Sequence, residues 1–271
     1  MTFVKFFYIP DVTKNGVKIV SDSAEIIESL SLVFGQYVYN SCFLTNNINI
    51  DIKSTDYGYI VTTSTHKRFF KGIEKVLIFL GKILHSIAVS DSWLLLHGFV
   101  IGKTDVSEAV ALVGASHSGK STLGTYLLNN GYDYISDDLV IVNVNSLEIV
   151  PFTRPIHLRA PSIDALKNYS LNINVEKNKV LSQRSLYYHS GINQSTCSLR
   201  SIYFVKYGLP CSVVECSSDY VFDKLVENIF SIGNLPGSIL NCKAIISRLE
   251  FYNLEYTDMN YARDQIMKTW K

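Results

Sequence analysis

The chain has 271 residues, a formal net charge of +1 at pH 7 and 18% charged residues. This length is sufficient for one large domain or two modest domains with a sizeable core. The near-neutral charge argues against a broad basic surface for nucleic acid and against a strongly acidic tail for a basic partner. We therefore predict no nucleic-acid partner.

The cysteines and the N-terminus indicate the compartment. The five cysteines are widely spaced and lack the C-x-x-C spacing of a structural zinc site; they are Cys42, Cys197, Cys211, Cys216 and Cys242. An odd number of cysteines fits a reducing compartment better than a disulfide framework. Residues 1–10 read as a strand rather than a signal peptide, and no apolar segment is long enough to span a bilayer. We predict a soluble cytoplasmic protein with no membrane partner.

The N-terminal part of the chain predicts a small α+β region. Short alternating segments in residues 1–65 predict a small antiparallel sheet. A short helix is expected over 23–30, with Ser23 available as its N-cap. Apolar residues at three- and four-residue intervals over 66–88 predict one long amphipathic helix. We place the boundary of this region at residue 90, so that a second domain covers 91–271.

The second domain alternates strands and helices. Predicted strands cover 92–101, 109–113, 134–136, 139–142, 147–152, 201–207 and 250–256, and predicted helices cover 122–128, 220–232 and 260–269. The segment 167–196 is polar and weakly patterned. A long irregular stretch inside a compact domain is usually functional, so this segment is a candidate lid or substrate loop.

Residues 114–121, with the sequence GASHSGKS, fill every fixed position of the phosphate-binding pattern G-x-x-x-x-G-K-[ST]. The two glycines let successive N–H groups point at a phosphate chain, and the following helix adds its positive end. Lys120 supplies a charge to the outer phosphates, and the Ser121 hydroxyl is placed to ligate Mg²⁺. The pattern predicts nucleoside triphosphate binding. The expected nucleotide contacts here are Gly114, Ser116, His117, Ser118, Gly119, Lys120, Ser121 and Thr122.

Asp137 and Asp138 follow Lys120 by 17 and 18 residues, at the tip of an apolar strand. Phosphoryl transfer needs Mg²⁺ and a group that orients or deprotonates the attacking oxygen. Paired carboxylates can divide these tasks, since one can hold the metal while the other accepts a proton. The alternative is a solvated turn between two strands.

Two histidines lie close to this pattern in the sequence. His97 opens a strand segment before the loop, where a single histidine is more often a core residue than a catalytic one. His117 occupies a variable position inside the loop, where it can contact substrate or face water.

Arg154 and Arg159 flank a Pro-Ile-His-Leu segment that follows the strands. Arginine side chains suit nucleotide phosphates or an anionic substrate, so both residues are candidate binding residues. The alternative is surface pairing with Glu148 or Asp164.

Taken together, these motifs resemble the catalytic domain of HPr kinase/phosphorylase and its relatives, a family whose nucleotide site is similar to that of phosphoenolpyruvate carboxykinase. The resemblance spans residues 92–160 and rests on the segments 96–100, 114–121, 130–132 and 136–138. It implies an α/β fold in which a P-loop catalytic domain with a mixed sheet follows a small α+β N-terminal region.

The resemblance also implies roles for individual residues. Lys120 and Ser121 would bind phosphates and metal, Asp137 would be the base, and Asp138 and His97 would support metal and base. Thr122 stands where the carrier-protein enzyme has a glutamate, so the chain looks more like the shorter stand-alone members.

The function implied is an ATP- and Mg²⁺-dependent kinase that phosphorylates a hydroxyl, most simply a serine of a precursor peptide or small protein. Two other functions stay open: a nucleotide-dependent switch that regulates a partner protein, and a small-molecule hydroxyl kinase. The sequence also leaves a homo-oligomer open.

Overall fold

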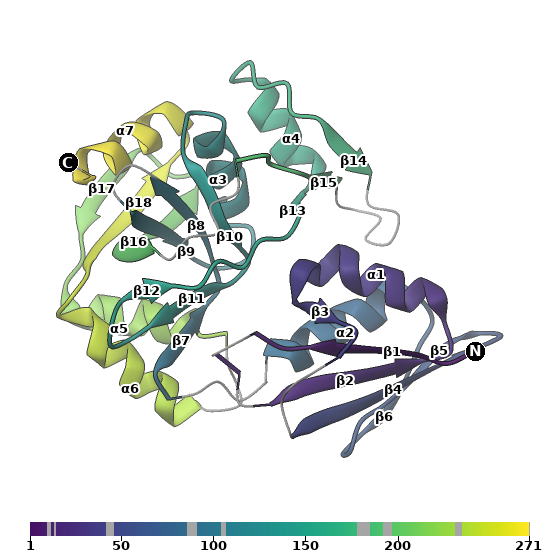
Figure 1. Ribbon diagram of the computed structural model, residues 1–271. Helices are drawn as coiled ribbons and strands as arrows, with labels where there is room; N and C mark the ends of the chain where they lie inside the picture. The colour runs from purple at the N-terminus through teal and green to yellow at the C-terminus, as the bar shows by residue number, and fades with distance from the viewer. Residues whose placement is uncertain are drawn as a thin grey trace. The chain divides into compact units, whose positions relative to one another are not determined.

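The computed structural model describes residues 1–9, 12–13, 15–41, 46–85, 91–103, 107–177, 185–191, 197–230 and 235–270. Over these residues the chain forms two compact units, one mainly from residues 1–90 and the other mainly from residue 91 onward. Each unit is a mixed α/β structure with a mixed sheet, as Figure 1 shows.

The first unit is a six-stranded sheet with strand order β3-β1-β2-β4-β5-β6. Its strands are β1 (Phe3–Phe7), β2 (Gly16–Ser21), β3 (Val38–Tyr39), β4 (Asn47–Thr55), β5 (Gly58–Thr62) and β6 (Lys67–Phe70). Helices α1 (Ala24–Phe34) and α2 (Ile73–His85) pack against each other and against this sheet, and η1 (Gly35–Tyr37) follows α1.

The N-terminal predictions hold in part. The Ser23 side chain accepts a hydrogen bond from the Ile26 N–H at 3.4 Å, which confirms it as the N-cap of α1. The sheet is mixed rather than antiparallel, because β2 and β4 pair in parallel. The long helix over 66–88 is wrong at its start, where residues 67–70 pair with β5 as a strand. Tertiary pairing overrides the helical period there, and residues 86–88 lie outside the described residues.

The second unit is a nine-stranded sheet with the main order β10-β8-β9-β16-β12-β11-β7; β18 pairs with β16, and β17 pairs with β18. Its strands are β7 (Trp93–Leu96), β8 (Gly98–Lys103), β9 (Glu108–Val113), β10 (Asp133–Asp137), β11 (Val140–Asn143), β12 (Glu148–Ile149), β16 (Cys197–Tyr207), β17 (Ser212–Glu215) and β18 (Glu250–Tyr256). The three strands β9, β16 and β18 are parallel to one another. The predicted strand over 147–152 is reduced to the two residues of β12 and an isolated β-bridge from Phe152 to Ser136.

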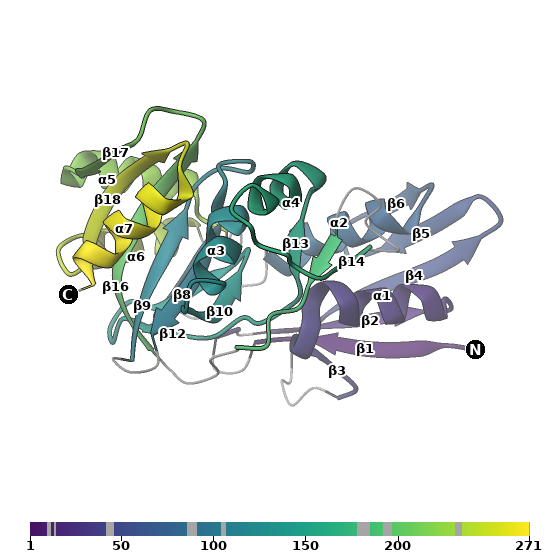
Figure 2. The same ribbon diagram turned by 90° about the horizontal axis from the view of Figure 1, so that it is seen from above.

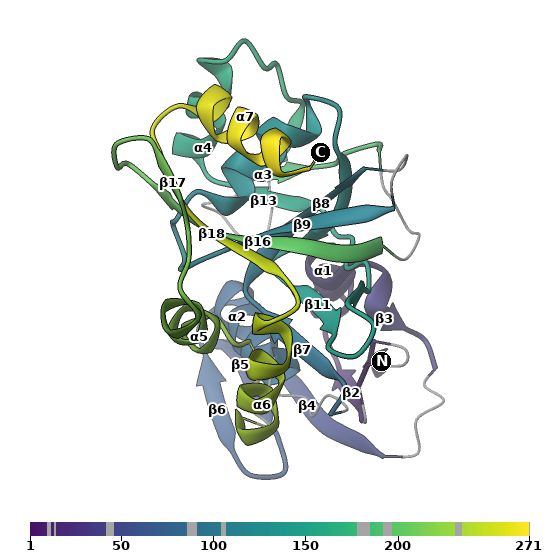
Figure 3. The ribbon, with the colours of Figure 1, turned by 90° about the vertical axis from the view of Figure 1, so that its left-hand side faces the viewer.

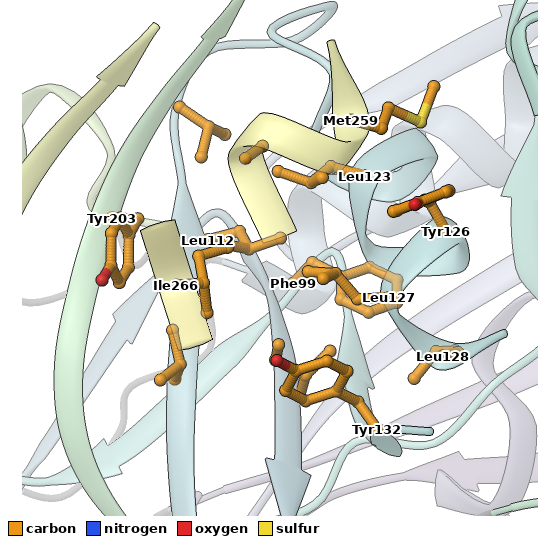
Figure 4. Packing of buried hydrophobic residues seen from close by; sticks show 14 of the residues in the cluster. Phe99, Leu112, Leu123, Tyr126, Leu127, Leu128, Tyr132, Tyr203, Met259 and Ile266 are labelled. Carbon is orange, nitrogen blue, oxygen red and sulfur yellow. The ribbon is translucent and has the colours of Figure 1, made fainter. Parts of the chain in front are cut away.

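Helices cover both faces of this sheet, as Figures 2 and 3 show: α3 (Lys120–Leu128) and α7 (Met259–Thr269) on one, α5 (Ser218–Glu227) and α6 (Leu235–Ile246) on the other. Alternate residues of a strand point to opposite faces. In β9, Leu112 (Figure 4) and Val110 therefore join the cluster under α3 and α7, whereas Ala109, Ala111 and Val113 join the cluster under α5 and α6. β9 is therefore buried on both faces, as is typical of a strand in a parallel arrangement covered by helices.

A smaller layer lies beside α3. It consists of α4 (Ala160–Lys167) and an antiparallel sheet of β13 (Ile156–Leu158), β15 (Ser185–Tyr187) and β14 (Val175–Lys177). The candidate lid over 167–196 contains β14 and β15, but 178–184 and 192–196 lie outside the described residues, so its role stays a prediction. In the parts of the chain that the structure describes, no helix has the length and hydropathy needed to cross a membrane.

Candidate functional site

The topology brings the ends of several strands to one edge of the sheet. In the parallel strands, Phe204 pairs with Val113 and Tyr207 pairs with Tyr256, so β9, β16 and β18 all end at this edge. The antiparallel strand β8 starts there, with Gly98 opposite Val113, and β10 ends there. The loop after β9 is therefore flanked by β8 and β10 on one side and by β16 and β18 on the other.

The loop at residues 114–121 is hydrogen-bonded to β16 and β18. Gly119 has φ +95°, a left-handed conformation that favours glycine, and it precedes the first residue of α3. The Tyr256 hydroxyl donates to the Gly119 carbonyl at 3.2 Å, and the Tyr207 N–H donates to the Ser118 carbonyl at 3.0 Å. A Cβ at residue 119 would overlap the Tyr256 hydroxyl and lie 3.0 Å from the Tyr207 Cβ. The loop conformation thus depends on a glycine at this position.

Gly119→Ala should destabilise the second unit by about 2–5 kcal/mol, the sum of a left-handed alanine and the overlap with Tyr256. Gly131→Ala is the matched control, because Gly131 also has positive φ (+90°) but has no atom within 4 Å of its would-be Cβ. Urea unfolding should show a loss of only about 1 kcal/mol for the control. Equal losses in the two variants would mean that the crowding at Gly119 is relieved without cost.

Lys120 is buried, 7% exposed, and its Nζ donates to the carbonyls of Gly114 and Ala115 at 2.8 Å each. Burial lowers its pKa to about 8, against the opposing effect of the nearby Asp138 and Asp137 carboxylates. The ammonium therefore stays mostly protonated at neutral pH, and its charge lies at the centre of the loop.

Asp137 is directly linked to the loop. The Ser121 hydroxyl donates to Asp137 Oδ1 at 2.9 Å, and Asp137 is only 1% exposed. Burial, and then repulsion from Asp138, raise the pKa of Asp137 to about 6. The alternative of a solvated turn is wrong, because this carboxylate is buried.

Asp138 is held differently. Its backbone adopts φ +68°, and one carboxylate oxygen accepts from the Arg154 guanidinium while the other lies 3.7 Å from His97 Nε2. Burial alone would raise the pKa of Asp138, but Arg154 and His97 hold it well below its usual range. Adjacent carboxylates thus differ in protonation: one titrates near neutral pH and the other stays ionised. A non-glycine residue with positive φ is a form of backbone strain found often at functional sites.

A cleft of about 350 Å³ opens above the loop. It is lined by His97, Ser116, His117, Gly119, Lys120, Ser121, Thr122, Asp138, His157, Arg159, Pro161, Ser162, Ala165, Tyr207, Tyr256 and Met259. Nine of the predicted site residues are in this set. Gly114, Ser118, Asp137 and Arg154 are not, although Asp137 and Arg154 contact residues that are.

The two arginines behave differently from each other. Arg154, predicted to bind phosphate or to pair with Glu148 at the surface, is 9% exposed and instead pairs with Asp138. Arg159 does line the cleft, and its Nη1 lies 2.6 Å from the His117 ring Nδ1. One arginine therefore orients a carboxylate, while the other places positive charge at the cleft wall.

Seven lining residues were not predicted from the sequence: His157, Pro161, Ser162, Ala165, Tyr207, Tyr256 and Met259. Ser162 belongs to α4, and its Oγ accepts from Thr122 Oγ1 at 2.8 Å. Tyr207 and Tyr256 are the last residues of two predicted strands. The rule that ligands bind at the carboxyl ends of parallel strands could have identified these two tyrosines.

The oxygen donors here fit a magnesium ion. Mg²⁺ is usually held by one or two carboxylates together with substrate phosphates and water, rather than by a cage of protein ligands. Ser121 and Asp138 both line the cleft, and Asp137, which accepts from Ser121, is the residue before Asp138. Among the described residues no group of three or more His, Cys, Asp or Glu side chains is placed to hold a metal, so these oxygens would need phosphate oxygens to complete the coordination.

Comparisons with known proteins give little beyond this geometry. No family model matches the chain, and no curated protein matches it. Among solved structures it is similar to the HPr(Ser) kinase/phosphatase from Coxiella burnetii, with 11% sequence identity, a TM-score of 0.32, and coverage of 65% of this chain and 92% of that chain. A similarity this distant does not show family membership, so the function has to be inferred from the residues of the cleft.

Proposed function

We propose that this protein is a kinase that transfers the terminal phosphoryl group of ATP to a hydroxyl. The observation that carries the proposal is the 2.9 Å hydrogen bond from Ser121 to the buried Asp137, which joins the loop to a pair of adjacent carboxylates beside a cleft. A loop alone predicts nucleotide binding. A loop joined to a carboxylate with a raised pKa also supplies a proton acceptor.

Each part of the site has a task in this reaction. The N–H groups after Gly114 and the Lys120 ammonium bind the phosphates, for which Lys120 must exchange its hydrogen bonds to the Gly114 and Ala115 carbonyls for phosphate oxygens. Ser121 and Asp138 would hold Mg²⁺, which neutralises phosphate charge when bound. Arg159 and His117 add positive charge at the rim of the cleft.

Asp137 is the proposed base. As the acceptor oxygen forms its bond to phosphorus, the bond from phosphorus to the bridging oxygen of ADP breaks, and the hydroxyl proton passes to an Asp137 carboxylate oxygen. A base works best when its pKa is near the operating pH. The pKa of Asp137, about 6, meets this condition, whereas the lowered pKa of Asp138 does not. Since Asp137 is 1% exposed, the Ser121 hydroxyl must first turn away from it.

The proposed acceptor is a serine of a peptide or small protein. The test is incubation with γ-labelled ATP and a panel of serine-containing peptides, with label on peptide and free phosphate measured in parallel. Transfer to a peptide that is abolished by Ser→Ala in that peptide supports the proposal. Phosphate release that is independent of any acceptor would instead indicate a nucleotide-dependent switch, and label on a small hydroxyl compound a metabolite kinase.

Lys120→Ala should weaken ATP binding by about 10- to 150-fold, because a charge-assisted contact to phosphate contributes about 1.5–3 kcal/mol. Isothermal titration calorimetry with Mg²⁺ and ATP checks this. Lys224→Ala is the control, since Lys224 lies on α5 and pairs with Glu227 outside the cleft. Unchanged affinity in Lys120→Ala would show that the loop does not bind phosphate.

A further inference from the structure

The cleft has two chemically different ends. The end beside β8 and β10 carries Asp138, His97 and the buried Asp137. The opposite end, beside β16 and β18, carries Tyr207, Tyr256 and Met259. The loop lies between the two, because β9 lies between β8 and β16 in the sheet. The α4 residues Pro161 and Ala165 add further apolar surface to the cleft wall.

Tyr207 is held in place at the aromatic end. Its N–H donates to the Ser118 carbonyl, and the next residue, Gly208, donates to the Tyr256 carbonyl, each at 3.0 Å. Its ring packs edge-on against Tyr256, with ring centroids 5.5 Å apart and an interplanar angle of 65°. Even so, Tyr207 remains 51% exposed. A half-exposed ring on a fixed backbone, lining a cleft, is a surface on which a flat group can stack.

The orientation of a bound nucleotide follows from the proposed chemistry. The transferred phosphoryl group must lie against Asp137 and Asp138, at the β8 and β10 end. The other phosphates occupy the loop above β9. The remote end of the nucleotide then extends toward β16 and β18, where Tyr207 lies three residues beyond Phe204, the last residue of β16 that pairs with β9.

We propose that Tyr207 is the stacking platform for the nucleobase, with Met259, Pro161 and Ala165 as apolar walls of the same subsite. This inference rests on the proposed binding of a nucleotide by the loop. Aromatic stacking accepts any base, because every base has a π-face. Phosphate contacts by the loop would then set the position of the ligand, and Tyr207 would add affinity for its remote end.

The test compares ATP with inorganic tripolyphosphate, which has the phosphates but no base. Calorimetric titrations with Mg²⁺ would be run on the unmodified protein and on Tyr207→Ala, Tyr207→Leu and Tyr207→Phe. Tyr207→Ala and Tyr207→Leu should each weaken ATP binding by about five- to hundredfold, with tripolyphosphate affinity unchanged. Tyr207→Phe retains the ring and should bind ATP close to the unmodified protein. Tyr188→Ala is the matched control, since Tyr188 is 50% exposed and does not line the cleft.

The outcomes separate the two proposals. ATP affinity that is unchanged in Tyr207→Ala and Tyr207→Leu, or an equal loss for ATP and tripolyphosphate, overturns the platform while nucleotide binding stands. A loss in Tyr207→Phe as large as in Tyr207→Ala also overturns it, because the hydroxyl would then be the contact. Failure of the unmodified protein to bind either ligand overturns the proposed function itself, and the platform with it. Thermal unfolding of each variant checks that the fold around Tyr256 is retained. Tyr207→Leu is included because leucine keeps apolar volume against Tyr256 but has no aromatic ring.

Discussion

Asp137→Asn should lower the rate of phosphoryl transfer by about 10²- to 10⁴-fold and leave ATP affinity within about threefold, because it removes a proton acceptor and no phosphate contact. Asparagine has nearly the same shape and still accepts the Ser121 hydrogen bond through its carbonyl oxygen. Single-turnover transfer of labelled phosphate gives the rate, and calorimetry gives the affinity. An equal loss of binding and transfer would mean that Asp137 is not a base.

The pH dependence gives an independent check on the same residue. Transfer should fall as the pH drops below about 6, because a protonated Asp137 cannot accept a proton. The residual activity of Asp137→Asn should not show this fall. Asp138→Asn is the comparison: if it loses the pH dependence and Asp137→Asn keeps it, the two carboxylates have the opposite roles.

As the pH rises, the folding stability should fall while the rate of phosphoryl transfer increases. Since the pKa of Asp137 is raised on folding from 3.8 to about 6, the folded state binds the proton more tightly, and stability falls as the pH rises between these values. This shift corresponds to about 3 kcal/mol, so Asp137→Asn should gain up to that amount at pH 8. Urea unfolding at pH 8 measures the gain. If Asp137→Asn were less stable than the unmodified protein at pH 8, burial would not raise the pKa of Asp137.

Arg154→Met should destabilise the second unit by about 3 kcal/mol, the lower end of the range for breaking a buried ion pair. Arg154 is 9% exposed and pairs with Asp138, whose side chain is 32% exposed and so retains some solvent. Methionine fills much of the same volume but leaves the Asp138 carboxylate without its counter-charge. The pKa of Asp138 should then rise, so the loss should be largest at high pH and shrink as the pH falls.

The double variant Arg154→Met/Asp138→Asn separates this electrostatic effect from lost packing. If the unpaired carboxylate is the cause, the double variant should recover about half or more of the stability lost in Arg154→Met. Arg200→Met provides a surface reference, because Arg200 pairs with Glu108 and their side chains are 30% and 32% exposed. Arg200→Met should lower the free energy of unfolding by about 1 kcal/mol or less. A double variant no more stable than Arg154→Met would show that packing dominates.

The part of the site that is local in sequence could be predicted. The glycine, lysine and serine positions of residues 114–121 follow from one short pattern, and the strand and helix on either side have strong periodicity. Asp137 and Asp138 were identified from their spacing to Lys120. The connection between the loop and these carboxylates is short, since it consists of one helix and one strand.

The rest depended on contacts that are distant in sequence. Tyr207 and Tyr256 reach the cleft only through the parallel pairing of β9, β16 and β18, which no local period encodes. Arg154 pairs with Asp138, 16 residues away in the chain, and not with Glu148. In the first unit, residues 67–70 carry a helical spacing of apolar residues but pair with β5.

The central position of β16 has a consequence for synthesis of the protein. The loop at residues 114–121 is translated early, whereas the strands that support it on one side end at Tyr207 and Tyr256. A chain still on the ribosome therefore carries the complete phosphate-binding pattern long before the tyrosine that bonds Gly119 leaves the exit tunnel. Because such long-range parallel pairing forms slowly and late, the loop should reach its final conformation only after Tyr256 has left the exit tunnel.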